Sequence, residues 1–518
     1  MPPMIRLALV LPAALALVPA ARAQTAMVTR PSRTLDRAAA TITTADVARR
    51  VRIIADDSMQ GRDTPSRGLE LTAQYIADEF RRLGLKPGGE DGTWFQRYPI
   101  TRRRFDLAGS SVTALAGNTT AAASFASAAR FVFGAVPAAP IEEVPLVLGG
   151  TPTADLAGAL PVRDRVVLAA LDPQRLGPAN VSQVLRALVM AGPKAVVLVS
   201  AGDSASFALR VPRTAPVRTV VDFGGPRQAV VLEVHEGALA PALRAAGLDL
   251  AQARAASGVT TREAAGLVLR LDAREEVLER TTAPNTIGIL EGTDPKLRHE
   301  YVVFSAHMDH VGVNPAAGAD SIFNGADDDA SGTVGVVELA EAFAQPGARP
   351  KRSILFITVS GEEKGLWGSR YFSERPTVPL TSMVANVNMD MIGRNWPDTI
   401  VAIGREHSDL GETLAQVNAA HPELRMTAID DRWPEERFYF RSDHFNFARK
   451  GVPILFFFNG VHDDYHRPSD SPDKIDAEKE ARLLRLVFFL GQEVANRPAR
   501  PKWNPRSYAE IVEVKGTP

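Results

Sequence analysis

Residues 301–310 read YVVFSAHMDH, and residues 353–363 read SILFITVSGEE. Each stretch begins with an apolar run as long as a buried strand and ends on histidines or acids. Further strand-like runs lie at 383–389 and 453–458, and residues 333–343 read as a helix. Strands that alternate with helices indicate an α/β fold with a mixed, largely parallel central sheet flanked by helices. The polar residues follow the strands, at the edge where such sheets place their ligands.

Length and composition define the broad class of the protein. The chain has 518 residues, which is too long for one ordinary core and predicts two domains or more. It is 45% hydrophobic and 23% charged, with a net charge of -1. This is an ordinary globular balance, and it gives no indication of nucleic-acid binding.

The first residues predict export. Arg6 precedes an apolar run over residues 7–18, and Ala21-Arg22-Ala23 fits a cleavage site. We interpret residues 1–23 as a signal peptide cut after Ala23, and we expect a periplasmic or secreted protein. The alternative is a membrane anchor, but the run is short for a bilayer, and no membrane anchor is expected after cleavage. The chain has no cysteine, so any metal site must use His, Asp and Glu.

Composition and hydrophobic periodicity change along the chain. Residues 24–40 lack periodicity and predict a flexible leader, whereas residues 44–52 and 71–83 predict helices. Residues 106–274 are rich in Ala and Val, with strand-like runs at 165–168 and 195–199 around a helix at 181–190. They predict a small α/β or β-rich inserted domain without a chemical cluster. The main domain then comprises 41–105 and 275–500, and 501–518 form a C-terminal tail.

Several motifs carry residue types that bind metal. His307 and Asp309 lie two apart at a strand end, so one imidazole nitrogen can bind a metal while the carboxylate accepts from the other. Asp327, Asp328 and Asp329 precede a helix and could cap it, or one of them could bridge two cations. By itself, a histidine at a strand end or an acid at a helix start is more often structural.

The remaining motifs complete a set of ligands. Glu362 and Glu363 follow an apolar strand, so that one could bind a metal while the other faces its water. Asp390 ends another apolar strand, where an unpaired carboxylate would be unfavourable. His466 lies in a polar loop. Imidazoles and carboxylates without thiolates suit two catalytic Zn²⁺ ions, with Mn²⁺ or Co²⁺ as possible substitutes.

Taken together, these motifs resemble those of peptidase family M28, the zinc aminopeptidases of the zinc-exopeptidase fold. The resemblance implies that residues 106–274 are a protease-associated domain. It also assigns the roles: one zinc held by His307 and Asp390, the other by Glu363 and His466, Asp328 bridging them, Glu362 as general base, Asp309 orienting His307, and Tyr439 stabilising the oxyanion.

The resemblance predicts hydrolysis of the N-terminal peptide bond of peptides with a free N-terminus, by a water that bridges the two metals. A carboxypeptidase of the same fold is the alternative, and it would need a basic cluster such as Arg394, Arg405, Arg432, Arg437 and Arg441. A glutaminyl-cyclase-like transferase and a non-catalytic peptide-binding protein are the other candidates. Residues 430–440, with Trp433, Phe438 and Tyr439, are the expected wall of the specificity pocket. The sequence gives no indication of the preferred N-terminal residue or of the oligomeric state.

Overall fold

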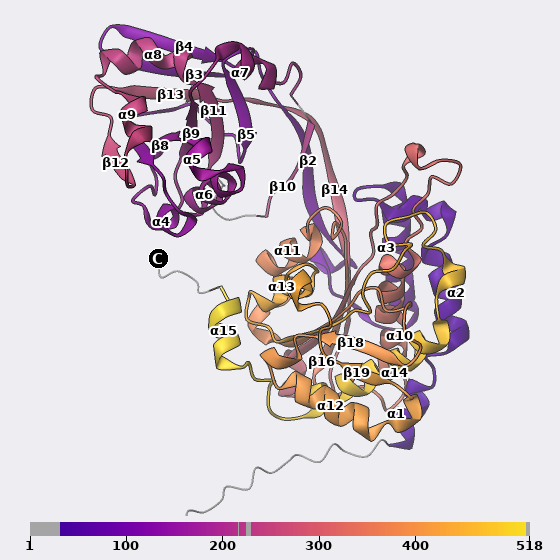
Figure 1. The fold of residues 1–518 in the computed structure, drawn as a ribbon. Coiled ribbons are helices and arrows are strands. Elements are labelled where there is room, and N and C mark those ends of the chain that lie inside the picture. Colours follow the sequence, from indigo (N-terminus) through magenta and orange to yellow (C-terminus); the bar gives the residue numbers. More distant parts are fainter. Residues whose placement is uncertain (1–31, 216, 224–228, 514–518) are drawn as a thin grey trace, which may run out of the picture.

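A computed structural model describes residues 32–215, 217–223 and 229–513. The chain forms a larger and a smaller lobe, joined by long strands (Figure 1). The predicted signal peptide at 1–23 lies outside the described residues. Within the described part, no helix is both long and apolar enough to cross a membrane.

The larger lobe is built on a ten-stranded sheet. Its four central strands are parallel and run in the order β16, β15, β17 and β20. Antiparallel pairings extend the sheet on both sides, so the predicted mixed sheet is confirmed, but it is parallel mainly at its centre rather than over most of its width. The strands are β1 (Lys86–Pro87), β2 (Phe95–Phe105), β10 (Val217–Val221), β14 (Glu275–Leu290), β15 (Tyr301–His307), β16 (Ser353–Val359), β17 (Met383–Met389), β18 (Thr399–Ile403), β19 (Thr427–Ile429) and β20 (Ile454–Phe457).

Helices cover both faces of this sheet (Figure 1). Successive side chains of β15 point to opposite faces: Phe304 packs with the helices α2, α3, α10 and α14, and Val303 packs with α11 and α13. Both faces are therefore apolar, as the unbroken hydrophobic runs of the strands predict. The helices of this lobe are α1 (Arg33–Ala39), α2 (Thr44–Ile54), α3 (Arg67–Arg82), α10 (Gly332–Ala344), α11 (Trp367–Glu374), α12 (Leu410–Ala420), α13 (His444–Ala448), α14 (Ala477–Asn496) and α15 (Pro505–Ile511).

The smaller lobe holds two further sheets and two hydrophobic clusters of its own. The predicted strands and helix appear as β8, β9 and α6. One sheet has β12, β7, β8, β9, β11 and β5 in order, and the other has β4, β3, β13 and β6. Its elements are β3 (Ser111–Ala116), β4 (Thr119–Ser124), β5 (Ala129–Phe133), β6 (Ile141–Glu143), β7 (Leu146–Gly150), β8 (Val166–Leu171), β9 (Ala195–Ser200), β11 (Val230–His235), β12 (Thr260–Glu263), β13 (Val268–Asp272), α4 (Ala154–Ala159), α5 (Pro173–Leu176), α6 (Pro178–Met190), α7 (Ser204–Arg210), α8 (Glu236–Ala245) and α9 (Leu250–Ala255).

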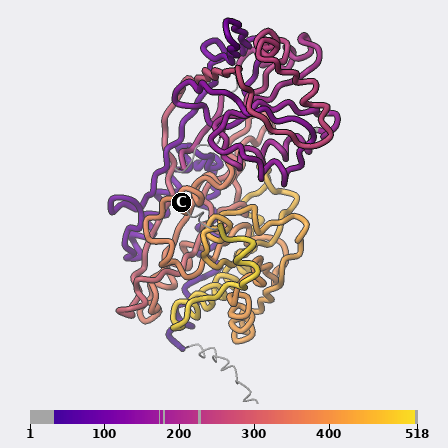
Figure 2. Tube along the Cα trace, turned by 90° about the vertical axis from the view of Figure 1, so that its left-hand side faces the viewer, coloured from indigo at the N-terminus to yellow at the C-terminus, as the bar shows by residue number. Residues whose placement is uncertain are grey.

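The strands β2 and β14 pair along most of their length and lead the chain into and out of the smaller lobe. Strand β10 lies within the range predicted as an insertion, yet it pairs with β2 in the ten-stranded sheet. In the view turned by 90° the smaller lobe still lies beyond one end of the larger lobe (Figure 2). The lobe is thus carried by the sheet that also holds the candidate site.

Two segments near the limits of the described residues form helices that the sequence does not predict. Residues 24–40 were expected to be a flexible leader, but residues 33–39 form α1, because the Ser32 side chain caps the helix and Ala38 and Ala39 are buried in the main core. In the predicted tail, α15 follows Trp503, whose indole donates to the carbonyl of Gly451 at 3.0 Å. Alanines such as Ala38 and Ala39, and a single contact such as that of Trp503, do not produce the hydrophobic periodicity from which a helix is predicted.

Candidate metal centre

The predicted ligands meet at the carboxyl edge of the central sheet. His307 ends β15, Glu363 follows β16, Asp390 follows β17 and His466 lies in the loop between β20 and α14. Asp328 lies in the turn just before α10. Because these four strands are adjacent and parallel, their carboxyl ends converge, and residues far apart in the sequence come into contact.

One group of ligand atoms gathers around His307. Its Nε2 lies 3.3 Å from Asp328 Oδ1 and 3.6 Å from Asp390 Oδ1. The other oxygen of Asp390 accepts a hydrogen bond from Ser442 Oγ at 2.8 Å. This leaves one imidazole nitrogen and two carboxylate oxygens facing a common point.

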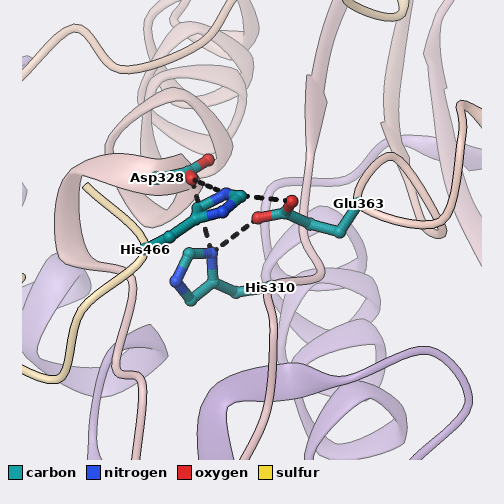
Figure 3. A group of neighbouring side chains, drawn as sticks. All are labelled: His310, Asp328, Glu363 and His466. Carbon is teal, nitrogen blue, oxygen red and sulfur yellow. Dashed lines mark ion pairs between the residues drawn. The ribbon is translucent and has the colours of Figure 1, made fainter. Parts of the chain in front are cut away.

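A second group shares Asp328 with the first (Figure 3). His466 Nε2 lies 3.1 Å from Asp328 Oδ2 and 3.0 Å from Glu363 Oε2. His310 Nδ1 lies 2.9 Å from Glu363 Oε1 and 3.5 Å from Asp328 Oδ2. The five predicted ligands are therefore brought together, and one residue that the sequence analysis did not assign, His310, joins them.

The chemistry of this donor set fits divalent cations. Asp328 Oδ2, Glu363 Oε1 and His466 Nε2 have no hydrogen-bond partner among the described residues. Burial by itself would raise the pKa of Asp328, but the neighbouring imidazoles of His310, His307 and His466 hold its pKa well below the usual value. Buried carboxylate oxygens and imidazole nitrogens that converge without hydrogen-bond partners destabilise the fold unless a cation or protons lie between them.

The two neighbours of Asp328 have structural partners. Asp329 Oδ1 accepts from the backbone N–H of Gly332 at 2.8 Å at the start of α10, and its Oδ2 accepts from the N–H of His307 at 3.1 Å. Asp327 Oδ1 accepts from the N–H of Gly393 at 2.7 Å. The three acids thus divide as the sequence suggests, with the outer two holding the turn and the strand ends in place.

Arg62 stabilises the loops that carry the site, and it belongs to none of the sequence motifs. Its guanidinium is fully buried and donates to the backbone carbonyls of Met308 at 2.9 Å, Asn324 at 2.6 Å and Gly325 at 2.9 Å. The loops that carry His307 and Asp328 are therefore tied to one side chain. Because Arg62 binds backbone carbonyls rather than a side chain, no pattern of residue types in the sequence indicates this role.

Glu362 faces the cavity that opens at this edge of the sheet. Burial raises the pKa of Glu362 well above its ordinary value, and the negative charges of Asp443, Asp390 and Glu363 act in the same direction. Its backbone N–H donates to Asp309 Oδ1 at 3.2 Å, which fixes the turn. A carboxylate with a raised pKa beside a ligand cluster has the properties of a general base.

The structure places Tyr439 away from this cavity. Its hydroxyl is buried without a hydrogen-bond partner among the described residues, and its ring packs against His407 at 4.5 Å and His444 at 5.6 Å. Tyr465 lines the cavity instead, with its ring stacked on His466 at 3.9 Å. Burial and the negative charges of Asp328 and Glu363 raise the pKa of Tyr465.

Much of the cavity lining is apolar. It includes Met391, Phe438, Phe456, Phe458 and Val461, together with Arg441. Of the predicted wall at 430–440, Phe438 lines the cavity, and Trp433 packs against Phe438. The lining thus combines acids and the imidazole of His307 with apolar side chains.

The comparison with known families agrees with this geometry. Residues 285–490, which include every one of the predicted ligands, match the model of peptidase family M28. This stretch of the chain is similar to peptidase family M28. The matched residues include the sheet edge just described, and the smaller lobe lies outside them.

The chain also resembles individual proteins, over part of its length. It is 28% identical over 230 residues to a probable leucine aminopeptidase of Arthroderma otae, covering 43% of this chain and 60% of that relative. It is 31% identical over 262 residues to a probable zinc metalloprotease of Pyrenophora tritici-repentis, covering 43% of this chain and 53% of that relative. The chain thus spans little more than half the length of these curated relatives. A solved aminopeptidase from Aneurinibacillus sp. strain AM-1 matches 91% of this chain and 98% of its own at 16% identity, with a TM-score of 0.47.

Proposed function

We propose that this protein is a metallo-aminopeptidase that holds two zinc ions and hydrolyses the N-terminal peptide bond of peptides. One observation carries the proposal: two ligand groups share Asp328 at the wall of a cavity that Glu362 also faces. In the proposed arrangement His307 and Asp390 hold one ion, Glu363 and His466 hold the other, and Asp328 bridges them. Mn²⁺ or Co²⁺ could take the place of zinc at such donors.

The chemistry follows from these side chains. Two divalent cations held here would lower the pKa of a water and polarise the scissile carbonyl. Glu362 would accept the proton of the attacking water and deliver it to the leaving amine, because its raised pKa suits both steps. Tyr465, rather than Tyr439, would donate to the oxyanion, since its ring lines the cavity beside His466.

The cavity suggests how a free N-terminus would bind. Its lining includes the carboxylates of Asp328, Glu362 and Asp390, which favour an ammonium group. Its apolar side chains would receive the first side chain of the peptide. The name of the Arthroderma otae relative, a probable leucine aminopeptidase, supports an apolar first residue.

The carboxypeptidase alternative needs cationic side chains that are free to bind a carboxylate. Four of the five candidate arginines are engaged elsewhere: Arg394 with Asp464, Arg405 with Asp430, Arg432 over Trp396 and Arg437 over Phe440. Arg441 lines the cavity, but it pairs with Glu436 at 3.1 Å and stacks on Phe438. This arrangement favours the aminopeptidase. A glutaminyl-cyclase-like transferase is the less favoured reading, because a second complete ligand group stands beside the first.

The test is a panel of amino-acid anilides, N-blocked peptides and C-amidated peptides, with metal analysis of the same sample. An aminopeptidase cleaves free and C-amidated peptides and spares N-blocked ones, and it contains two metal ions per chain. Cleavage that requires a free C-terminus would identify a carboxypeptidase, and release of a cyclised product would identify a cyclase. Activity that survives complete removal of metal would refute the proposal.

Export forms a separate part of the proposal. It rests on the predicted signal peptide at 1–23, and it implies a mature protein that begins at Gln24 in the periplasm or outside the cell. N-terminal sequencing of the protein from fractionated cells tests it. A cytoplasmic protein that retains residue 1 would show that the prediction is wrong.

A further inference from the structure

His310 is a fully buried histidine beside two of the proposed metal ligands. It lies three residues after His307, just beyond β15. Its Nδ1 is 2.9 Å from Glu363 Oε1 and 3.5 Å from Asp328 Oδ2 (Figure 3). Neither the sequence motifs nor the comparisons assign it a function.

The contact between His310 and Glu363 does not have the alignment of a hydrogen bond. Although the two atoms are 2.9 Å apart, both His310 Nδ1 and Glu363 Oε1 lack a hydrogen-bond partner among the described residues. Asp328 Oδ2 and His466 Nε2 also lack one. Lone pairs that approach closely without pointing at each other are expected when all of them point at one shared cation.

The surrounding backbone holds the imidazole in this position. The N–H of His310 donates to the carbonyl of Arg62 at 3.3 Å, and Arg62 in turn binds the carbonyl of Gly325. A β-carbon on Gly325 would lie 2.6 Å from the His310 ring, so the loop before Asp328 presses against the ring. An orientation fixed by both neighbouring loops is typical of a metal ligand.

We propose that His310 is a direct ligand of one of the two cations, which it binds through Nδ1 together with Asp328, Glu363 and His466. The inference rests on the proposed two-metal function and deepens it, because it makes the two sites unequal. The site around His307 has one imidazole and two carboxylates, whereas the site around His310 has two of each. The second site should therefore bind Zn²⁺ or Co²⁺ first and more tightly.

A second role for His310 has to be separated from the first, namely that it only donates a hydrogen bond that orients Glu363. Two substitutions do this, because the side-chain oxygens of Asp and the amide of Asn reach as far from the backbone as Nδ1 does. His310→Asn keeps a donor but is a poor ligand for zinc. His310→Asp keeps a ligand atom but, when ionised, has no donor.

The experiment titrates Zn²⁺ into metal-free protein in the presence of a competing chelator. The wild type should bind two ions with different affinities. His310→Asn should weaken the tighter site by more than ~100-fold, beyond the 10–100-fold typical of residues that only position a ligand, and His310→Asp should restore most of the affinity. If His310→Asn binds like the wild type, or if His310→Asp binds worse than His310→Asn, the ligand assignment is refuted.

A matched control and a measurement on the unaltered protein complete the test. His421 is also buried, with Nδ1 2.8 Å from Glu423 Oε1, but it belongs to no ligand group among the described residues, so His421→Gln should not change metal binding. X-ray absorption at the zinc edge of the wild type should report three imidazoles shared by two ions. Two imidazoles for two ions would overturn the inference and leave the proposed function intact, whereas a wild type that binds no zinc would overturn both.

Discussion

The carboxylate of Asp309 accepts a hydrogen bond from the backbone N–H of Glu362 at 3.2 Å. Its other oxygen accepts from Thr64 Oγ1 at 3.1 Å, and that hydroxyl accepts from the N–H of Gly361 at 3.0 Å. The Nδ1 atom of His307 lies nearer the backbone carbonyl of Asp309, at 3.2 Å, than its carboxylate, at 3.7 Å. The acid expected to orient the first histidine is therefore also the anchor of the turn that carries the proposed base.

Asp309→Asn should lower kcat by roughly 10–100-fold, because the amide cannot accept from both Thr64 and Glu362 as the carboxylate does. The loss in kcat should exceed the loss in zinc affinity, since the turn of Glu362 moves more than His307. Steady-state kinetics and metal content measured on one preparation check this. Asp63→Asn is the control, because Asp63 is a nearby, partly exposed acid that pairs with Lys364. Loss of zinc with an unchanged kcat per bound metal would contradict the prediction.

Glu362→Gln should reduce kcat by roughly 10²–10⁴-fold, because the amide cannot accept the proton of the attacking water. Two metal ions per chain should remain bound, since this side chain belongs to neither of the two ligand groups. Turnover of an amino-acid anilide and elemental analysis provide the two readouts. Glu374 lies at the end of α11 and forms an ion pair with Arg449, so Glu374→Gln should behave like the wild type. Activity near that of the wild type in Glu362→Gln would exclude this residue as the base.

Arg62→Ala should destabilise the larger lobe by at least about 3 kcal/mol, because it leaves several buried carbonyls without a donor. Arg62→Lys should cost less, since an ammonium group can satisfy some of them. Chemical denaturation in the presence of a chelator measures both without a contribution from bound metal. Arg81→Ala, at an exposed arginine that pairs with Asp78 and lies over the ring of Trp94, should change the free energy of unfolding by less than about 1 kcal/mol. Equal midpoints for Arg62→Ala and Arg81→Ala would contradict the assignment.

His444 should make the protein less stable in acid. Burial lowers the pKa of His444 to about 3, so the folded protein keeps it neutral while the unfolded chain takes up a proton below its ordinary pKa of 6.5. Its contribution to stability is complete above pH 6.5 and is lost as the pH falls toward 3, by up to about 1.4 kcal/mol per pH unit. His444→Phe keeps the ring that stacks on Phe456 but cannot take up a proton. In denaturation series with a chelator between pH 7 and pH 5, the wild type should lose stability more steeply, and parallel curves would contradict this.

Phe438→Ala should change the choice of substrate. Phe438 lines the apolar wall of the cavity and packs against Phe458 with ring centroids 4.8 Å apart. Its removal should lower kcat/KM for a leucine substrate by about tenfold or more and affect an alanine substrate much less, because a small side chain does not reach the wall. The ratio of the two kcat/KM values is the readout. Phe440→Ala, at a neighbouring exposed ring outside the lining, is the control. An unchanged ratio in Phe438→Ala would move the specificity pocket elsewhere.

Local sequence patterns predict much of the fold because they reflect local physics. The run at 353–360 is apolar at every interior position except Thr358, which is typical of a strand buried on both faces, and β16 is such a strand. Helix α3 begins at Arg67, four residues before the periodic run that predicts it, because the Ser66 side chain caps it there. Helix boundaries depend on such single capping contacts, whereas the apolar period determines the interior.

The candidate site shows the same division. The motifs place candidate acids and histidines after strand ends, because that pattern is visible in one dimension. The resemblance to peptidase family M28 is what selects five ligands and a base among them. Tyr439 and Tyr465 cannot be distinguished by the pattern alone. Each precedes a polar motif. In the structure, however, the ring of Tyr439 packs against His407, whereas Tyr465 lines the cavity. His310 directly follows Asp309 in the sequence, and a histidine next to an acid is usually solvated. Only the structure shows that His310 is fully buried beside the ligands.

The sequence by itself determined the sheet, the order of its strands along the chain and the residue types at their carboxyl ends. Hydrophobic periodicity and the absence of cysteine are properties of the chain alone. Tertiary structure decided which strands are neighbours, and therefore that Asp328 lies between His307 and His466. It also decided that Arg62 holds two loops and that His310 faces Glu363. These contacts join residues far apart in the sequence, and their distances depend on how strands and helices pack, which no local pattern records.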